Sequence, residues 1–154
     1  MAIKTEHLFH KEFLRMSALL SAVCLFMVGI YSEKVEAQEV IVNMSVNKTK
    51  INKRVLKSIF RMQLLTWPDG TPIKVFVLPG KNSTHVSFSK TVLNTLPHSL
   101  QRNWDKLVFS GTGESPVIVK SEEEMLKRIA TTRGAIGYVA NIEKKTKIKV
   151  LHVY

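Results

Sequence analysis

The sequence predicts an α/β fold, and the evidence for that prediction lies in residues 121–139, SEEEMLKRIATTRGAIGYV. This stretch combines a helix start, an apolar stripe at helical spacing and an apolar run after a glycine. The stripe predicts a helix, and the run at 135–139 predicts a buried strand directly behind it. A helix followed at once by a buried strand is half of a βαβ unit, so we expect helices layered on a sheet.

The helix is predicted from its two ends and from its stripe. Ser121 and Glu124 match the S-x-x-E capping box, in which each side chain bonds an N–H group of the first turn. Glutamates 122–124 lie at the positive end of the helix dipole, whereas Lys127 and Arg128 lie nearer its negative end. The apolar side chains at helical spacing are Met125, Leu126, Ile129 and Ala130.

Two glycines are expected to shape the junction between this helix and its strand. Gly134 is predicted to end the helix, because only glycine enters the left-handed C-cap conformation without strain. Gly137 lies inside the predicted strand and indicates a close approach of another part of the chain.

Local patterns also predict the elements from residue 40 to residue 78. The apolar run 40–42 predicts a strand covered on both faces, and Asn52 is a candidate N-cap for the helix after it. Residues 67–70, WPDG, predict a tight turn, and residues 73–78 predict the second strand. The apolar side of the helix is expected to hold Val55, Leu56, Ile59 and Phe60.

The middle of the chain is expected to contain two helical segments and a short strand. Residues 82–84, NST, offer cap groups for a helix that Pro97 interrupts. A further helical segment carries Leu100, Trp104 and Leu107, and the predicted role of Trp104 is core packing. After a loop at 110–113, residues 116–119 predict a short strand.

The end of the chain is predicted to form a β-hairpin. Residues 138–141 and 147–153 are its two strands, and residues 143–146, EKKT, are its turn.

The first 37 residues have the pattern of a signal peptide. A basic region precedes the apolar, uncharged run 17–31, and residues 35–37, VEA, resemble a cleavage site. The run is short for a membrane span, which needs about 20 apolar residues. We therefore expect an exported protein, periplasmic after cleavage at Ala37-Gln38, whose domain comprises residues 38–154. An uncleaved signal anchor is the alternative.

The net charge of +11 falls entirely on residues 38–154, which carry 19 basic and eight acidic side chains. Such basicity indicates an anionic partner, although an evenly charged, soluble surface explains it as well. The single cysteine, Cys24, lies in the predicted signal peptide, so the expected mature chain has no disulfide and no thiolate chemistry.

Side chains for catalysis are not grouped in the sequence. The histidines 85, 98 and 152 stand apart from other potential metal ligands, and no paired carboxylates suggest general acid–base chemistry. We therefore predict no enzyme, no catalytic residue, no metal site and no cofactor.

Anion binding by backbone groups is the chemistry that remains. The loop 80–84, GKNST, precedes a predicted helix, so its N–H groups and the helix dipole would hold an oxyanion. The hydroxyls of Ser83 and Thr84 would add donors. The alternative is that one of these two residues only caps the helix, and the local sequence alone favours that alternative.

Four segments, in order along the chain, carry a resemblance to a known family. They are Ile59-Phe60 with Trp67, Asn82-Ser83-Thr84 with Phe88, Trp104 with Leu107-Val108-Phe109-Ser110-Gly111, and Gly134-Ala135-Ile136-Gly137-Tyr138-Val139. Together they resemble the second lobe of the phosphate-binding proteins of ABC transporters, which have the type II periplasmic solute-binding fold. The last segment matches the G-A-I-G-Y-V strand of that family.

The resemblance implies a single lobe with a mixed sheet of about five strands flanked by helices. It implies ligand contacts at Asn82, Ser83 and Thr84, with Thr112 nearby. The chain also departs from the family, because Met62 replaces a glycine, and Leu78 and Gly80 stand in the places of an arginine and an aspartate beside the phosphate. No segment resembles the first lobe, and one lobe cannot close on a ligand as two lobes do.

Two functions are therefore expected from the sequence. The first is an exported solute-binding-type module with weak affinity for phosphate or a similar oxyanion, linked to ABC-type phosphate uptake. The second is an envelope interaction protein that reuses the lobe as a scaffold and binds no small solute. The partners considered are the oxyanion, a membrane transporter or envelope protein, and a second copy of the chain; nucleic acid is not expected.

Overall fold

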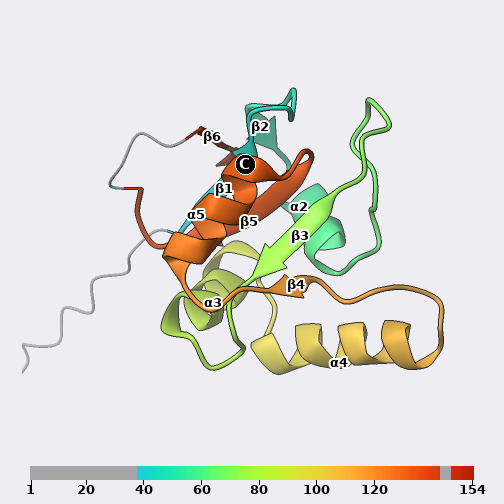
Figure 1. Ribbon diagram of the computed structural model, residues 1–154. Coiled ribbons are helices and arrows are strands. Elements are labelled where there is room, and N and C mark those ends of the chain that lie inside the picture. Colours follow the sequence, from blue (N-terminus) through green and yellow to red (C-terminus); the bar gives the residue numbers. More distant parts are fainter. Residues whose placement is uncertain (1–37, 143–146) are drawn as a thin grey trace, which may run out of the picture. The chain divides into compact units, whose positions relative to one another are not determined.

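The computed structural model describes residues 38–142 and 147–154 (Figure 1). The predicted signal peptide and the predicted hairpin turn lie outside the described residues. Within the described ranges no helix is long and apolar enough to cross a membrane.

A five-stranded mixed sheet forms the centre of the domain. Its strands are β1 (Glu39–Asn43), β3 (Lys74–Val77), β4 (Val117–Ile118), β5 (Ala135–Val139) and β6 (Ile148–Val150), in the order β4-β3-β5-β1-β6. β3 runs parallel to β4 and β5, whereas β1 runs antiparallel to β5 and β6. The predicted α/β class with a mixed sheet of about five strands is confirmed.

Two short strands form a second sheet. β2 (Lys50–Ile51) pairs in parallel with β7 (His152–Val153).

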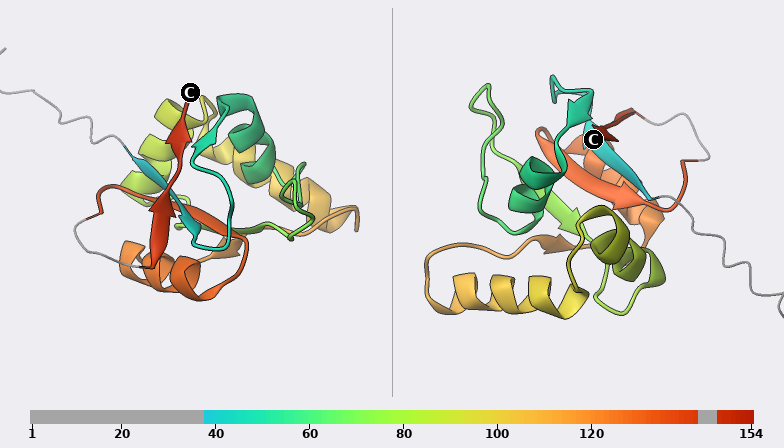
Figure 2. Two further views of the ribbon diagram at one scale, coloured as in Figure 1. Left: turned by 90° about the horizontal axis from the view of Figure 1, so that it is seen from above. Right: turned by 180° about the vertical axis from the view of Figure 1, so that it is seen from behind.

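Helices cover both faces of the large sheet (Figure 2). α5 (Glu122–Thr131) lies on one face, and α2 (Lys53–Phe60) and α3 (Ser83–Ser87) lie on the other. α3 continues into η1 (Phe88–Val92), a π-helical turn, and α4 (Pro97–Phe109) follows it. A π-helical turn inside a helix is rare and often lies close to a functional position.

The two faces of β5 use opposite kinds of residue. Gly137 faces α5, where a Cβ atom would lie 2.5 Å from Met125 Sδ, so the predicted close approach is confirmed. Tyr138 faces the opposite layer and stacks on Phe88, with ring centroids 3.9 Å apart, while Phe60 packs beside both rings. The strand thus joins the two halves of the core.

Both tryptophans are buried and hydrogen-bonded. The indole N–H of Trp104 donates to Phe60 O at 2.8 Å, and that of Trp67 donates to Gly134 O at 2.9 Å. The predicted core role of Trp104 is confirmed.

The start of α5 differs in one bond from the predicted capping box. Ser121 Oγ accepts from the Glu124 N–H at 3.2 Å, as expected. The Glu124 carboxylate, however, accepts from the N–H of Lys120 at 2.9 Å, one residue before the N-cap. The chain enters the helix with Ser121 extended, and this places the Lys120 N–H within reach.

The end of α5 corrects the role predicted for Gly134. The helix ends at Thr131, because Thr132 is extended, and the side-chain amide of Asn43 on β1 donates to the last-turn carbonyl groups of Ile129 and Ala130. Gly134 has a φ of 71° and lies beyond this end. The predicted left-handed conformation is thus confirmed, but the C-cap of the helix is Thr132. Glycine is required by this φ and by packing, because a Cβ atom would lie 2.2 Å from Pro72 O.

Two further predictions were wrong. β5 and β6 do not form a hairpin, because β1 lies between them and both edges of β5 are already paired with β1 and β3. Val55, expected in the core, is 41% exposed, because the buried side of α2 consists of Leu56, Ile59 and Phe60.

Candidate functional site

The carboxyl ends of the three parallel strands, β3, β4 and β5, lie at the same end of the sheet, here called its carboxyl edge. Ligands of open α/β sheets bind outside this edge. Here β3 leads into the loop before α3, β4 leads into the start of α5, and Ala140 follows β5 directly. Segments far apart in sequence therefore meet at this edge (Figure 1).

Asn82 is the N-cap of α3 and uses up donors of the predicted anion loop. Its Oδ1 accepts from the N–H groups of Thr84 at 2.9 Å and His85 at 3.2 Å. These two N–H groups are therefore not available to a ligand, which corrects the expectation of a loop with free donors. The cap is Asn82 itself, not Ser83 or Thr84 as the alternative had it.

The Thr84 hydroxyl is already hydrogen-bonded to a carboxylate of the chain itself, that of Glu122. Thr84 Oγ1 donates to Glu122 Oε1 at 2.6 Å, and the backbone N–H of Ala140 donates to Glu122 Oε2 at 2.9 Å. Glu122 is the first residue of α5 and is half-buried. Its carboxylate thus connects α3, α5 and the end of β5.

The structure groups three of the four predicted site residues. Asn82, Ser83 and Thr84 lie together at the start of α3, and Ser83 is exposed. Thr112 follows the far end of α4, where its hydroxyl bonds Ser110 Oγ at 2.7 Å. α4 starts beside α3, and its 13 residues form about 20 Å of helix between that start and Thr112.

A buried hydrogen-bond chain runs beneath the loop. The N–H of Leu78 donates to the Tyr138 hydroxyl at 3.0 Å, and this hydroxyl lies 2.5 Å from Nδ1 of His85. Burial lowers the pKa of His85 and raises the pKa of Tyr138, and the Glu122 charge raises the latter further. Both groups are therefore neutral at pH 7, and the tautomer of His85 sets which of the two donates the hydrogen bond between them.

Leu78 explains part of the departure from the family pattern. Its side chain is buried in the core, and its N–H group is bound by Tyr138. The position where the family has an arginine consequently supplies no contact to an anion.

A basic cleft lies next to the loop. It has a volume of about 640 Å³ between α3 and α4, and Gly80 and His85 form part of its wall. Lys90 and Arg102 contribute cationic side chains, and none of the described lining residues is acidic. Some of the excess positive charge of the chain is thus concentrated beside the strand ends.

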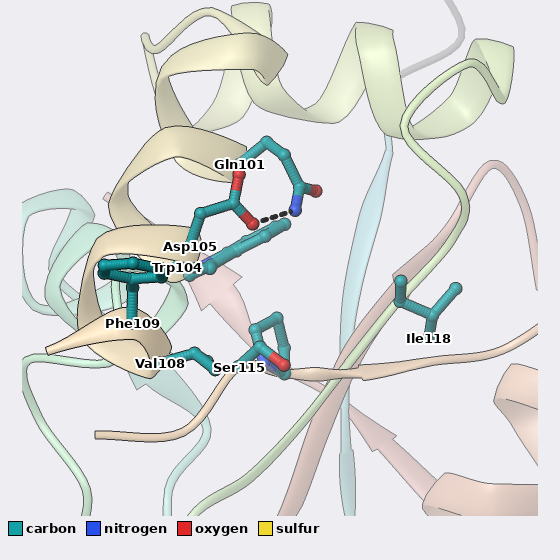
Figure 3. A pocket seen from close by; sticks show the side chains of 8 residues that line it. Gln101, Trp104, Asp105, Val108, Phe109, Ser115 and Ile118 are labelled. Atoms are coloured by element: carbon teal, nitrogen blue, oxygen red, sulfur yellow. Dashed lines mark hydrogen bonds between the residues drawn. The ribbon is translucent and has the colours of Figure 1, made fainter. Parts of the chain in front are cut away.

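An apolar groove lies between α4 and β4 (Figure 3). Its volume is about 280 Å³, and Trp104 forms one wall. Phe109 at the end of α4 is 97% exposed, and Ile118 on β4 is 61% exposed. Gln101 and Asp105 bond to each other at the rim, with Nε2 and Oδ1 2.7 Å apart.

In the described part of the chain, no three potential metal ligands come together.

Sequence reasoning missed Glu122 and Ala140. Glutamates 122–124 were all explained by the helix dipole, so the contacts of Glu122 with Thr84 and Ala140 were not predicted. The meeting of parallel strand ends at one edge was the signal that would have placed α3 and α5 side by side.

Comparison with known proteins yields the fold. No family model matches the chain, and no curated protein matches its sequence. Solved structures do match. PstS from Borrelia burgdorferi aligns with a TM-score of 0.56 and 18% identity, over 76% of this chain and 47% of that one. An ABC-type phosphate transport receptor from Vibrio cholerae aligns with a TM-score of 0.54 and 14% identity, over 77% and 47%.

A third match was solved with its ligand. It is a protein from Clostridium perfringens, described as a phosphate ABC transporter substrate-binding protein with bound phosphate. It aligns with a TM-score of 0.59 and 14% identity, over 77% of this chain and 46% of that one.

The chain has the fold of one lobe of such a protein. It spans about half the length of the structures that it matches. The expected resemblance is thereby confirmed at the level of the fold.

Proposed function

We propose that the chain is an exported solute-binding-type module that holds phosphate or a similar oxyanion weakly at Thr84. One observation carries the proposal. The Thr84 hydroxyl and the Ala140 N–H, from different elements, converge on the two oxygens of one carboxylate. Donors so arranged at the carboxyl ends of parallel strands suit an oxyanion, and the matched protein from Clostridium perfringens was solved with phosphate.

The cellular setting belongs to the same proposal. The signal-peptide pattern of residues 1–37 supports export to the periplasm, with cleavage at Ala37-Gln38. The matched proteins belong by name to phosphate ABC transporters. The corresponding partner of this chain would be a membrane transporter.

The affinity is expected to be low. Leu78 stands where the resembled family has an arginine, so the site lacks the bidentate arginine contact that holds anions more strongly. We expect a dissociation constant in the micromolar-to-millimolar range, about −4 to −8 kcal/mol. Burial of the open face by a partner or by a second copy would strengthen binding.

Amide NMR during titration with phosphate and with sulfate tests the proposal. The amides of Ser83, Thr84 and Ala140 should shift, and Thr84→Val should weaken the response by about tenfold through loss of the hydroxyl. Thr112→Val is the matched control, because it removes the same group at the far end of α4. Loop amides that stay unmoved at high phosphate concentration would refute binding at this site.

The apolar groove favours a second candidate function. An envelope interaction protein that binds no small solute would use the exposed Val108, Phe109 and Ile118, which line it. Contiguous exposed apolar surface of this kind is typical of protein contacts. Photo-crosslinking in cells from position 109, with position 57 on α2 as control, tests this candidate. A discrete crosslinked species from position 109 alone supports it, and equal labelling from both positions refutes it.

A further inference from the structure

We infer that Glu122 is an internal ligand of the oxyanion position and limits its affinity for external anions. The inference rests on the proposed function in placing the external anion at Thr84. Glu122 supplies no hydrogen-bond donor to an external anion, but its carboxylate occupies the Thr84 and Ala140 donors that such an anion would need.

Glu122 differs from Glu123 and Glu124 in that both of its carboxylate oxygens bond groups outside its own helix. Each oxygen accepts one hydrogen bond, from Thr84 Oγ1 and from the Ala140 N–H, and these donors lie on α3 and after β5. Glu123 is exposed, whereas the Glu124 carboxylate bonds the Lys120 N–H at the start of its own helix. Three consecutive glutamates thus have three different environments, and only Glu122 reaches across the sheet edge.

An external anion and Glu122 compete for the same donors. A hydroxyl proton serves one strong acceptor at a time, so a ligand bonds Thr84 Oγ1 only when Glu122 Oε1 has left it. The two anions also repel each other, and this repulsion is weakly screened at a half-buried position. The self-bonded arrangement is therefore the resting state of the site, and ligand binding requires Glu122 to turn away.

The same bonds give Glu122 a structural effect that must be separated from its effect on binding. Its carboxylate joins α3 to α5, so its removal also loosens the contact between these helices. Glu122→Gln keeps the shape of the side chain and removes the charge. Glu122→Ala removes the competing group altogether.

Phosphate titrations of the full chain and of three variants test the inference, with amide NMR and calorimetry as readouts. Glu122→Gln and Glu122→Ala should bind phosphate at least about tenfold more tightly than the unmodified chain, because the like charge is gone. Glu123→Gln is the matched control. It removes the same charge from the same helical turn and should change the affinity by less than about twofold.

A second readout does not depend on affinity. In Glu122→Ala without phosphate, the Ala140 amide loses its acceptor and should exchange with solvent faster than in the unmodified chain. Added phosphate should slow this exchange again. An Ala140 amide that exchanges equally fast with and without phosphate would overturn the inference, because no anion then takes the place of the carboxylate.

The outcomes distinguish the inference from the function on which it rests. If the unmodified chain and Glu122→Gln bind phosphate equally well, the inference falls and the proposed function stands. If only the Glu122 variants bind, the inference stands and the proposed binding by the unmodified chain falls. If none of the proteins binds, both fall.

Discussion

β3 has two parallel neighbours in the sheet, and they differ in length and in burial. β5 has five residues, all buried, and pairs Ile136 with Val75. β4 has two residues, 47% and 61% exposed, and pairs Ile118 with Val77. Both strands contain β-branched apolar residues, which favour strands equally well in either place. Coverage by other elements therefore decides which strand belongs to the core. α5 and a cluster of aromatic rings enclose β5, whereas both side chains of β4 are exposed.

The largest expected effect compares the same residue in these two strands. Ile136→Ala should lower the free energy of unfolding by about 2–5 kcal/mol, because it leaves a cavity in a fully buried position. Ile118→Ala should change it by no more than about 0.5 kcal/mol, because the side chain is mostly exposed. Urea unfolding measures both values. Equal losses would show that β4 is as much a part of the core as β5.

A smaller effect tests how closely α5 approaches β5. Gly137→Ala should lower the free energy of unfolding by about 1–3 kcal/mol, because the new methyl group would overlap Met125. Gly80→Ala is the matched control at the carboxyl edge, where a Cβ atom meets nothing within 4 Å. Unfolding midpoints that agree for the two variants would mean that Met125 moves aside freely.

The smallest expected effect is a pH dependence beneath the loop. Burial lowers the pKa of His85 from its ordinary value of 6.5, so the unfolded chain binds a proton at a higher pH than the folded one. Stability should therefore be complete above about pH 6.5 and should fall as the pH drops towards the folded pKa. His85→Asn should flatten the pH profile of the urea midpoint below pH 6.5. His98→Asn is the matched control, because it makes the same substitution at an exposed position.

Local signals explain how much of the fold could be predicted. The α5–β5 unit follows from a cap, a stripe and glycines that lie within 19 residues, and the turn at 67–70 follows from its own four residues. Strand pairing is not local. The apolar run of β1 shows that the strand is covered, but the run contains no information on its partners. The predicted hairpin was therefore wrong.

The candidate site was predicted in part for the same reason. Thr84 stands in a loop whose sequence resembles a phosphate loop, and the structure places it at the strand ends. Glu122 has a sufficient local explanation in the helix dipole, so nothing in the sequence required a distant contact. Thr112 was placed near the loop by resemblance alone, and the length of α4 carries it away.

The position of β1 has a consequence for the order of folding. Glu39 pairs with Val139, and Ile41 pairs with Val150, so β1, which lies between β5 and β6, joins residues about a hundred positions apart. Closing so long a loop is entropically unfavourable until the contacts at its end have formed. While the ribosome is still adding residues, β1 has no permanent neighbour on either side. The sheet is therefore completed only after β5 and β6 have been synthesised, and refolding of the domain should be slow for its size.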